Sequence, residues 1–260
     1  MDLGISGKWG IVEAASKGLG RGSAAALAAE GVNLVLNARG VDALEATASA
    51  IRATSPGVTI KTVVGDITQR EVRQRVLDAA PVVDILVTNA GGPPPGNFRT
   101  DTRERWLAAL EGQLLSHVEM ITAVIDGMAE RGFGRIVNIT SASVRMPIHN
   151  LGLSTAARMA LTGFASTISR EVVARNVVIN NLLPGPFDTD RLRGSIAFAA
   201  QKDGISVESA HAARLAENPS GRFGTAEEFG KVCAFLCSQH VGFITAQNLL
   251  MDGGAFPGNI

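Results

Sequence analysis

The chain has 260 residues, with 24 lysines and arginines against 24 aspartates and glutamates, so its formal net charge is zero. A neutral chain gives no indication of a nucleic-acid partner or an acidic membrane surface. The first ten residues lack the pattern of a secretory signal, and no apolar run approaches ~20 residues, so we expect no membrane partner and a cytoplasmic location. The length fits one α/β domain over residues 1–260.

Metal and disulfide chemistry have little support in the sequence. Cys233 and Cys237 are the only cysteines, and they lie four residues apart on an expected helix. This spacing favours two core residues over a disulfide or a metal pair. No group of histidines, cysteines or acids has metal-ligand spacing, so we predict no metal site.

Residues 8–31 predict a strand, a turn of small residues and a helix. An apolar run at 9–12 precedes the turn, and apolar residues then recur at helical spacing up to Gly31, which is placed to end the helix. This arrangement directs unpaired backbone N–H groups and a helix N-terminus at a phosphate. The spacing is Ala-x-x-x-Gly-x-Gly, which differs from the G-x-G-x-x-G fingerprint. The residues expected to bind a cofactor here are Ala14, Ser16, Lys17, Gly18, Leu19 and Gly20.

The end of the second expected strand, 32–36, carries information on the cofactor. An acidic residue at this place would accept hydrogen bonds from the adenosine ribose hydroxyls, and the sequence has none there. Arg39 instead offers a guanidinium suited to a 2′-phosphate, and Lys17 can reach the same phosphate as a point charge. We therefore predict that the chain prefers NADP(H) to NAD(H).

Apolar strands continue to alternate with helical patterns along the rest of the chain, which indicates an α/β fold. Strands are expected at 58–64, 82–87, 135–139, 177–182 and 247–251. Helices are expected at 41–53, from 68, at 102–131, at 151–173 and from 225. Gly112 and Gly127 inside the long helical region indicate close packing or a break.

Small and polar residues follow several of these strands. Asn89, Ala90 and Gly91 allow close approach of a ligand at the carboxyl edge of the sheet. Asp66 can accept a hydrogen bond from an adenine amino group or cap the following helix, and the sequence leaves both roles open. The Pro-Pro-Pro-Gly loop at 93–96 is expected to form the rim of a substrate pocket.

Segment 187–224 follows a Pro-Gly-Pro break and has the composition of a mobile lid over that pocket. Its apolar residues include Leu192 and Ile196, which either contact a hydrophobic ligand or pack the lid onto the domain. The sequence does not define the substrate.

Taken in order, several short motifs resemble the short-chain dehydrogenase/reductase family, and in layout its 3-oxoacyl-carrier-protein reductase-like branch. The motifs are AASKGLG, GDIT, TNAG, IVNITS, PGPFDT, GRFGTAEE and MDGG, and they extend over nearly the whole chain. The resemblance implies a doubly wound Rossmann fold, with a seven-stranded parallel sheet and helices on both faces. It also implies a nicotinamide cofactor, a small-molecule substrate and a homotetramer. Further cofactor contacts that it implies are Ile67, Pro184, Gly185 and Thr189.

The first turn departs from the family pattern Thr-Gly-x-x-x-Gly-x-Gly at two positions. Ala14 stands in place of a glycine, which is tolerable if the position has an ordinary negative φ. Glu13 stands in place of a threonine at a nearly buried position, so it needs a partner that the sequence does not identify.

The catalytic residues implied by the resemblance depart further from the family. Its tetrad is Asn, Ser, Tyr and Lys, and the corresponding positions here hold Gln113, Ser141, Ser154 and Arg158. The chain contains no tyrosine. Ser141 remains suited to hydrogen-bonding a substrate oxygen, with Ser143 as a helper. Arg158 is a poor acid but can hold a ribose hydroxyl or stabilise an oxyanion.

Reduction of a carbonyl also needs a proton for the developing alkoxide. That proton can come from a water held by Ser141, Ser154 and Gln113, or from His149, because histidine is a common general acid near neutral pH.

Three functions are compatible with this sequence. We favour an NADP(H)-dependent oxidoreductase that interconverts a carbonyl and an alcohol with an atypical active site. The alternative is a catalytically inactive nucleotide-binding protein of the same fold, acting as a sensor or assembly partner. A cofactor-free enzyme such as a halohydrin dehalogenase is the least favoured, because the phosphate turn and Arg39 are present.

Overall fold

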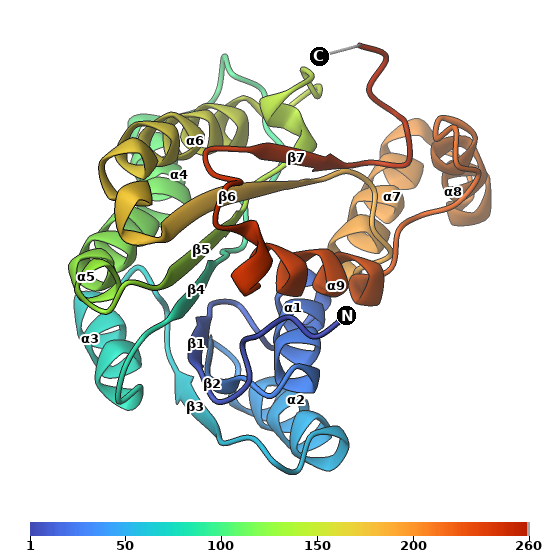
Figure 1. Cartoon of the computed structure of the whole chain (residues 1–260). Helices are drawn as coiled ribbons and strands as arrows, with labels where there is room; N and C mark the ends of the chain where they lie inside the picture. The colour runs from blue at the N-terminus through green and yellow to red at the C-terminus, as the bar shows by residue number, and fades with distance from the viewer. Residues whose placement is uncertain (259–260) are drawn as a thin grey trace.

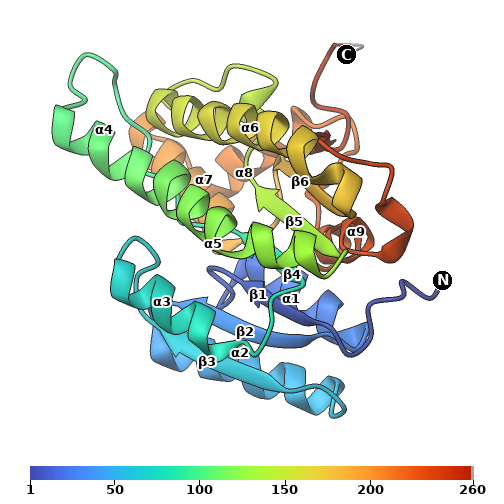
Figure 2. The ribbon, with the colours of Figure 1, turned by 60° about the vertical axis from the view of Figure 1, so that its left-hand side comes forward.

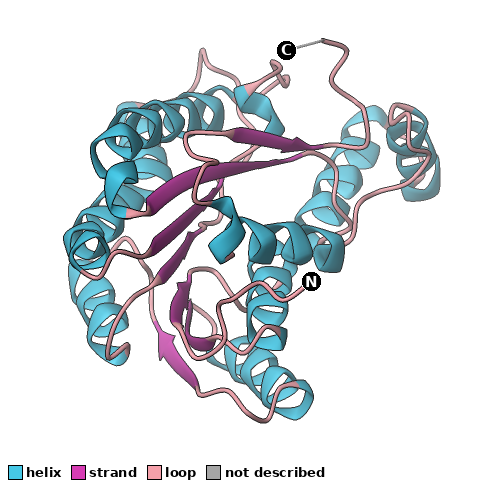
Figure 3. Cartoon of the chain, in the orientation of Figure 1, coloured by secondary structure: helices cyan, strands magenta, loops and turns pink. Residues whose placement is uncertain are grey.

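The apolar runs of the sequence form the strands of one parallel sheet, in the order β3-β2-β1-β4-β5-β6-β7 (Figure 1, Figure 3). The structure is a computed structural model and describes residues 1–258. The strands are β1 (Trp9–Val12), β2 (Asn33–Ala38), β3 (Ile60–Val64), β4 (Ile85–Thr88), β5 (Gly134–Ile139), β6 (Val177–Pro184) and β7 (Asn248–Met251). The predicted doubly wound fold with a seven-stranded parallel sheet is confirmed.

The helices alternate with these strands along the chain. They are α1 (Gly18–Ala29), α2 (Val41–Thr54), α3 (Arg70–Ala79), α4 (Arg103–Leu110), α5 (Ser116–Glu130), α6 (Gly152–Val172), α7 (Asp190–Asp203), α8 (Val207–Ala216) and α9 (Ala226–Leu236). Short helical turns occur at η1 (Glu111–Leu115), η2 (Ala142–Val144), η3 (Val173–Arg175) and η4 (Gln239–Val241). No helix within residues 1–258 combines the length and the apolar character that crossing a membrane requires.

The sheet is buried on both faces, which explains the continuous apolar runs of its strands. Val12 and Leu36 contribute to a core cluster with α1, α2 and α9, and Ile11 and Val35 contribute to a second cluster with α3, α5 and α6. Figure 2 shows the helices of the second cluster beside the sheet. The two faces therefore use alternate residues of the same strands.

The helix layer on one face depends on a close crossing of α1 and α9. A Cβ atom on Gly22 would overlap the carbonyl oxygen of Ala226, and one on Gly230 would overlap the carbonyl oxygen of Gly22. Cys233 on α9 and Cys237 at its C-cap are buried and unbonded, so the prediction that they are core residues is confirmed.

The strand order reverses between β1 and β4, from which the chain winds outward in both directions. Val12 is in register with Leu36 of β2 and with Val87 of β4, so the carboxyl ends of three strands meet at one edge. Doubly wound proteins bind ligands at this switch point.

The long helical region predicted at 102–131 is interrupted. Gly112 lies in the π-helical turn η1 between α4 and α5, so the break that its sequence position indicated is present. A π-turn inserts an extra residue into the helix and is often found at functional sites. Here it carries Gln113.

Segment 187–224 contains two helices that the sequence analysis did not predict. The Thr189 side chain caps α7, Gly204 ends it with φ 66°, and the Ser206 side chain caps α8. Ile196 is buried in a small cluster that Leu192 also contacts, separate from the main core. Leu192 and Ile196 therefore pack the helices of this segment, which extend to one side of the sheet (Figure 1), while Phe198 and Ile205 are exposed.

Candidate active site

The turn after β1 presents the N-terminus of α1 to the carboxyl edge of the sheet. Helix α1 begins with no side-chain cap and no acidic residue in its first turn, so its first N–H groups are open to an anion. Gly18 has φ 51°, and a Cβ atom on Gly20 would overlap the Ala14 carbonyl oxygen. The turn thus needs glycine at both positions, as a phosphate-binding turn does. Leu19 packs against the core, and the Ser16 carbonyl accepts a hydrogen bond from Thr47 Oγ1 at 3.0 Å.

Ala14 does not meet the condition set from the sequence. Its φ is 46°, in the left-handed region, whereas we required an ordinary negative φ for alanine to replace glycine there. The missing glycine therefore strains the turn, by about 1–2 kcal/mol for a residue with a Cβ atom.

Glu13 has the partner that the sequence could not identify. Its Oε2 lies 2.9 Å from His117 Nδ1 on α5, both side chains are buried, and the contact does not have the geometry of a hydrogen bond. The same oxygen accepts a hydrogen bond from the backbone N–H of Asn89 at 3.2 Å, while Oε1 has no partner within residues 1–258. The pair thus ties the ends of β1 and β4 to α5.

Arg39 extends across the same edge of the sheet. A Cβ atom on Gly91 would lie 3.8 Å from Arg39 Nη2, so the exposed guanidinium stands opposite the loop that follows β4.

In the turn after β3, Asp66 Oδ1 accepts hydrogen bonds from the backbone N–H and hydroxyl of Thr68. This turn precedes α3, and Ile67 is buried beneath it.

The segment that follows β6 lies beside the turn formed by residues 14–20. The methyl group of Thr189 would be 3.3 Å from a Cβ atom on Gly18, so the start of α7 faces the turn. Gly185 packs directly against Asp252, which fixes the backbone just after Pro184. Lys17 Nζ is 3.6 Å from Asp190, so its charge is directed toward α7.

Three of the four candidate catalytic residues form one buried hydrogen-bonded chain. Arg158 Nε donates to Ser154 Oγ at 3.2 Å, and Ser154 Oγ donates to Gln113 Oε1 at 3.0 Å. Arg158 Nη1 also donates to the carbonyl oxygens of Ile139 and Thr140, each at 2.7 Å. These bonds hold the guanidinium at the carboxyl end of β5, and burial, with the nearby Arg191, lowers the pKa of Arg158 to about 10.

Ser141 and His149 lie outside this chain. The Ser141 hydroxyl oxygen accepts a hydrogen bond from the backbone N–H of Ser143 at 3.1 Å. The Ser143 hydroxyl is buried and has no partner within residues 1–258. His149 is exposed and lines neither cavity described next.

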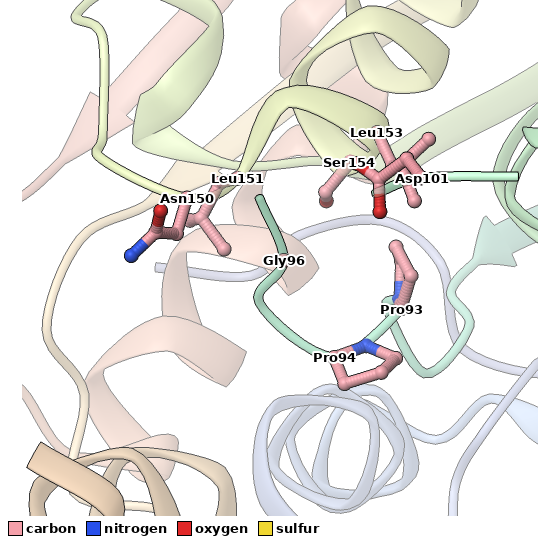
Figure 4. A pocket seen from close by; sticks show the side chains of 8 residues that line it. All are labelled: Pro93, Pro94, Gly96, Asp101, Asn150, Leu151, Leu153 and Ser154. Atoms are coloured by element: carbon pink, nitrogen blue, oxygen red, sulfur yellow. The ribbon is translucent and has the colours of Figure 1, made fainter. Parts of the chain in front are cut away.

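The proline-rich loop lines two pockets, of which the first is too narrow for a water molecule. One is lined by Pro93, Pro94, Gly96, Asp101, Asn150, Leu151, Leu153 and Ser154 (Figure 4). The other, of about 200 Å³, is lined by Gly91, Gly92, Pro93, Pro94, Arg105, Ala108, Ala109, Gly112 and Gln113. The loop is tied down where Gly96 N–H donates to the Asn150 carbonyl at 2.9 Å, and Asp101 pairs with Arg105 at 2.6 Å beside it.

Sequence reasoning missed three groups at this site: the Glu13–His117 pair, the Asp101–Arg105 pair and Arg191, which donates to the Gly92 carbonyl at 3.2 Å. Glu13 itself was a signal, because an acid in a buried strand requires a partner. Arg191 gave no signal, because it lies in a segment whose helices were not predicted.

A doubly wound sheet with a small-residue turn and a helix N-terminus at its switch point is typical of proteins that bind a dinucleotide. The family model described as enoyl-(acyl carrier protein) reductase matches residues 14–255. The chain belongs to the short-chain dehydrogenase/reductase family.

Individual relatives agree with this assignment. The 3-oxoacyl-[acyl-carrier-protein] reductase FabG of Escherichia coli is 30% identical over 254 residues, which cover 98% of this chain and 99% of FabG. The NADPH-dependent reductase BacG of Bacillus subtilis is 28% identical over 255 residues, 96% of this chain and 98% of BacG. The crystal structure of L-sorbose reductase from Gluconobacter frateurii with NADPH and L-sorbose superposes with a TM-score of 0.93 at 27% identity, covering 99% of this chain and 100% of that chain.

Proposed function

We propose that this protein is an NADP(H)-dependent oxidoreductase that interconverts a carbonyl and an alcohol, in the manner of a 3-oxoacyl reductase. The observation that carries the proposal is the chain from Arg158 through Ser154 to Gln113, at the same edge of the sheet as an uncapped helix N-terminus. The relative BacG is an NADPH-dependent reductase, and the similar L-sorbose reductase structure contains NADPH, which supports the choice of cofactor.

The residues present fit this cofactor. The turn 14–20 with the N-terminus of α1 would hold the pyrophosphate, and Arg39 the 2′-phosphate. Asp66 and Ile67 would lie at the adenine, Asn89, Ala90 and Gly91 along the ribose, and Pro184, Gly185 and Thr189 near the nicotinamide. When bound, the cofactor supplies or accepts a hydride.

The side chains supply the remaining chemistry. Arg158 would hold a ribose hydroxyl and stabilise a developing oxyanion, since a pKa of about 10 leaves it charged at neutral pH. Ser141 would hydrogen-bond the substrate oxygen. Because the chain contains no tyrosine, the proton would come from a water held by Ser141, Ser154 and Gln113.

The absence of tyrosine also favours the second candidate, a nucleotide-binding protein of this fold without hydride chemistry. A serine hydroxyl is a much weaker acid than a tyrosine of pKa ~10. The two candidates differ in one outcome, which is turnover of a carbonyl substrate with NADPH. A Ser141→Ala variant that keeps full turnover would contradict the role given to Ser141.

We further propose that 187–224 acts as a lid on a single domain, 1–260, and that the chain forms a cytoplasmic homotetramer. Large apolar side chains are exposed on two separate faces, at Trp106 and Leu107 of α4 and at Phe243 and Leu249 near β7. Two such faces support an assembly with two kinds of contact. Light scattering would give four chains, and a monomer would refute the proposal.

The cofactor assignment is tested by fluorescence titration with NADPH and, separately, NADH. We expect tight NADPH binding and weak NADH binding. Arg39→Gln should weaken NADPH binding about tenfold or more without changing NADH binding, because it removes one charge-assisted contact. Arg170→Gln, an exposed change at the end of α6, is the matched control. Binding of neither cofactor would refute the oxidoreductase.

A further inference from the structure

Two arginines at the candidate active site have no carboxylate partner. Arg158 on α6 is buried and Arg191 on α7 is exposed. No acidic side chain within residues 1–258 lies within 4.0 Å of either guanidinium. The two charges are close enough to repel each other, and this repulsion adds to burial in lowering the pKa of Arg158. A counter-charge at this point would therefore be stabilised.

A third donor points to the same place. The Gln113 side chain is 1% exposed, and its Oε1 is occupied by Ser154, which leaves the Nε2 amide without a partner. A Cβ atom on Gly92 would lie 2.7 Å from this Nε2 and 2.8 Å from Arg191 Nη2. The amide and the guanidinium are therefore close neighbours beside Gly92.

The free groups of this cluster are all donors. Within residues 1–258, neither Arg158 Nη2 nor Arg191 Nη2 donates a hydrogen bond, and Gln113 Nε2 is buried and unpaired. A buried donor without an acceptor costs free energy, and a negatively charged acceptor makes the strongest bonds to guanidinium groups. The cluster is therefore complementary to a small anion.

We propose that the substrate is a small oxo acid, whose free carboxylate is bound by Gln113 and Arg191, with the charge of Arg158 nearby. The adjoining cavity of about 200 Å³, lined by Gly92 and Gln113, suits a molecule of this size, since sites for drug-sized ligands run from about 300 to 1,000 Å³. The inference rests on the proposed function, because the carbonyl of the same molecule is the group that is reduced. A cofactor phosphate carries the same chemistry as a carboxylate, so the test must separate the two sources.

The experiment compares matched acids and esters that differ only in charge. Pyruvate, acetoacetate and levulinate, with their methyl esters, are titrated by calorimetry into the protein saturated with NADP⁺, so that no turnover occurs. Arg191→Gln is the test variant. Arg193→Gln is the matched control on the same helix, because Arg193 is paired with Asp188 and Asp190.

We expect at least one acid to bind ten or more times more tightly than its ester. Arg191→Gln should reduce that preference about tenfold and leave NADPH affinity unchanged, and Arg193→Gln should change neither. Equal binding of acid and ester, or binding of no probe, overturns the proposal while cofactor binding still stands. A loss of NADPH affinity in Arg191→Gln with no change in the acid preference assigns the cluster to a cofactor phosphate. Failure of the wild type to bind NADPH refutes the proposed function itself.

Discussion

The buried pair of Glu13 and His117 gives the most direct prediction about the fold at the active site. The Glu13 carboxylate is fully buried, and the His117 ring is 3% exposed. If His117 becomes valine, Glu13 keeps only the backbone N–H of Asn89 as a partner for two carboxylate oxygens. The carboxylate must then remain charged in an apolar environment or take up a proton.

The expected cost follows from the geometry of the pair. Removing one partner so that a buried polar group is left unsatisfied costs about 1–3 kcal/mol, and more for a charged group. Because Glu13 is fully buried but keeps the Asn89 contact, we expect about 3 kcal/mol for His117→Val. For a chain of this size the corresponding fall in Tm is roughly 6–12 °C.

The double variant Glu13→Thr/His117→Val is the matched control. It removes both buried polar side chains and leaves a hydroxyl that can accept from the Asn89 N–H, so its stability should lie within about 1.5 kcal/mol of the wild type. Urea unfolding followed by tryptophan fluorescence measures all three chains. The reasoning is refuted if His117→Val costs less than about 1 kcal/mol, or if the double variant is less stable than the single one.

Three further predictions concern single residues. Gly230→Ala should lower the free energy of unfolding by more than about 2 kcal/mol, because the added Cβ atom overlaps the α1 backbone. The control Gly163→Ala on α6 meets nothing within 4 Å, so it should be neutral or stabilising. Equal effects of the two changes would contradict the close crossing of α1 and α9. Ala14→Gly should stabilise by about 0.5–1 kcal/mol in thermal unfolding by relieving the positive φ, and a loss would contradict that strain. Arg222 and the N–H of Thr225 lower the pKa of Glu228 to about 2, so Glu228→Gln should lower Tm at pH 7. The difference in Tm between wild type and variant should close as the pH falls from about 4.5 toward 2. A difference in Tm that does not depend on pH would contradict the pairing of Glu228 with Arg222.

The sheet was predictable because it depends on local pattern. The apolar runs of the sequence became the strands of the sheet, most of them buried on both faces, and Gly31, with φ 80°, ends the first α-helical segment as expected. The strands start one to three residues later than predicted at β3, β4 and β7.

The helices of 187–224 were missed for a physical reason. Their apolar residues do not face the main core, so Ile196 is buried in a small cluster while Phe198 is 59% exposed. Such a pattern gives a weak helical signal, and the caps at Thr189 and Ser206 carry most of the local information.

The candidate site was only partly predictable. Ser154, Arg158 and Gln113 were identified from the family resemblance, and the structure joins them by hydrogen bonds. The partner of Glu13 lies on a helix far along the chain, and the φ of Ala14 depends on the close approach of Gly20. Contacts of this kind arise from packing between distant segments, which no local pattern records.

The central claim is that this protein transfers a hydride although it has no tyrosine. The most direct measurement incubates it with NADPH carrying deuterium at the transferred position and with the three oxo acids and their esters, and then examines the alcohols by mass spectrometry. We predict one deuterium atom in at least one product, on the carbon that was the carbonyl, and less of it with Ser141→Ala. Tight NADPH binding with no deuterium in any product would contradict this claim and favour the nucleotide-binding protein.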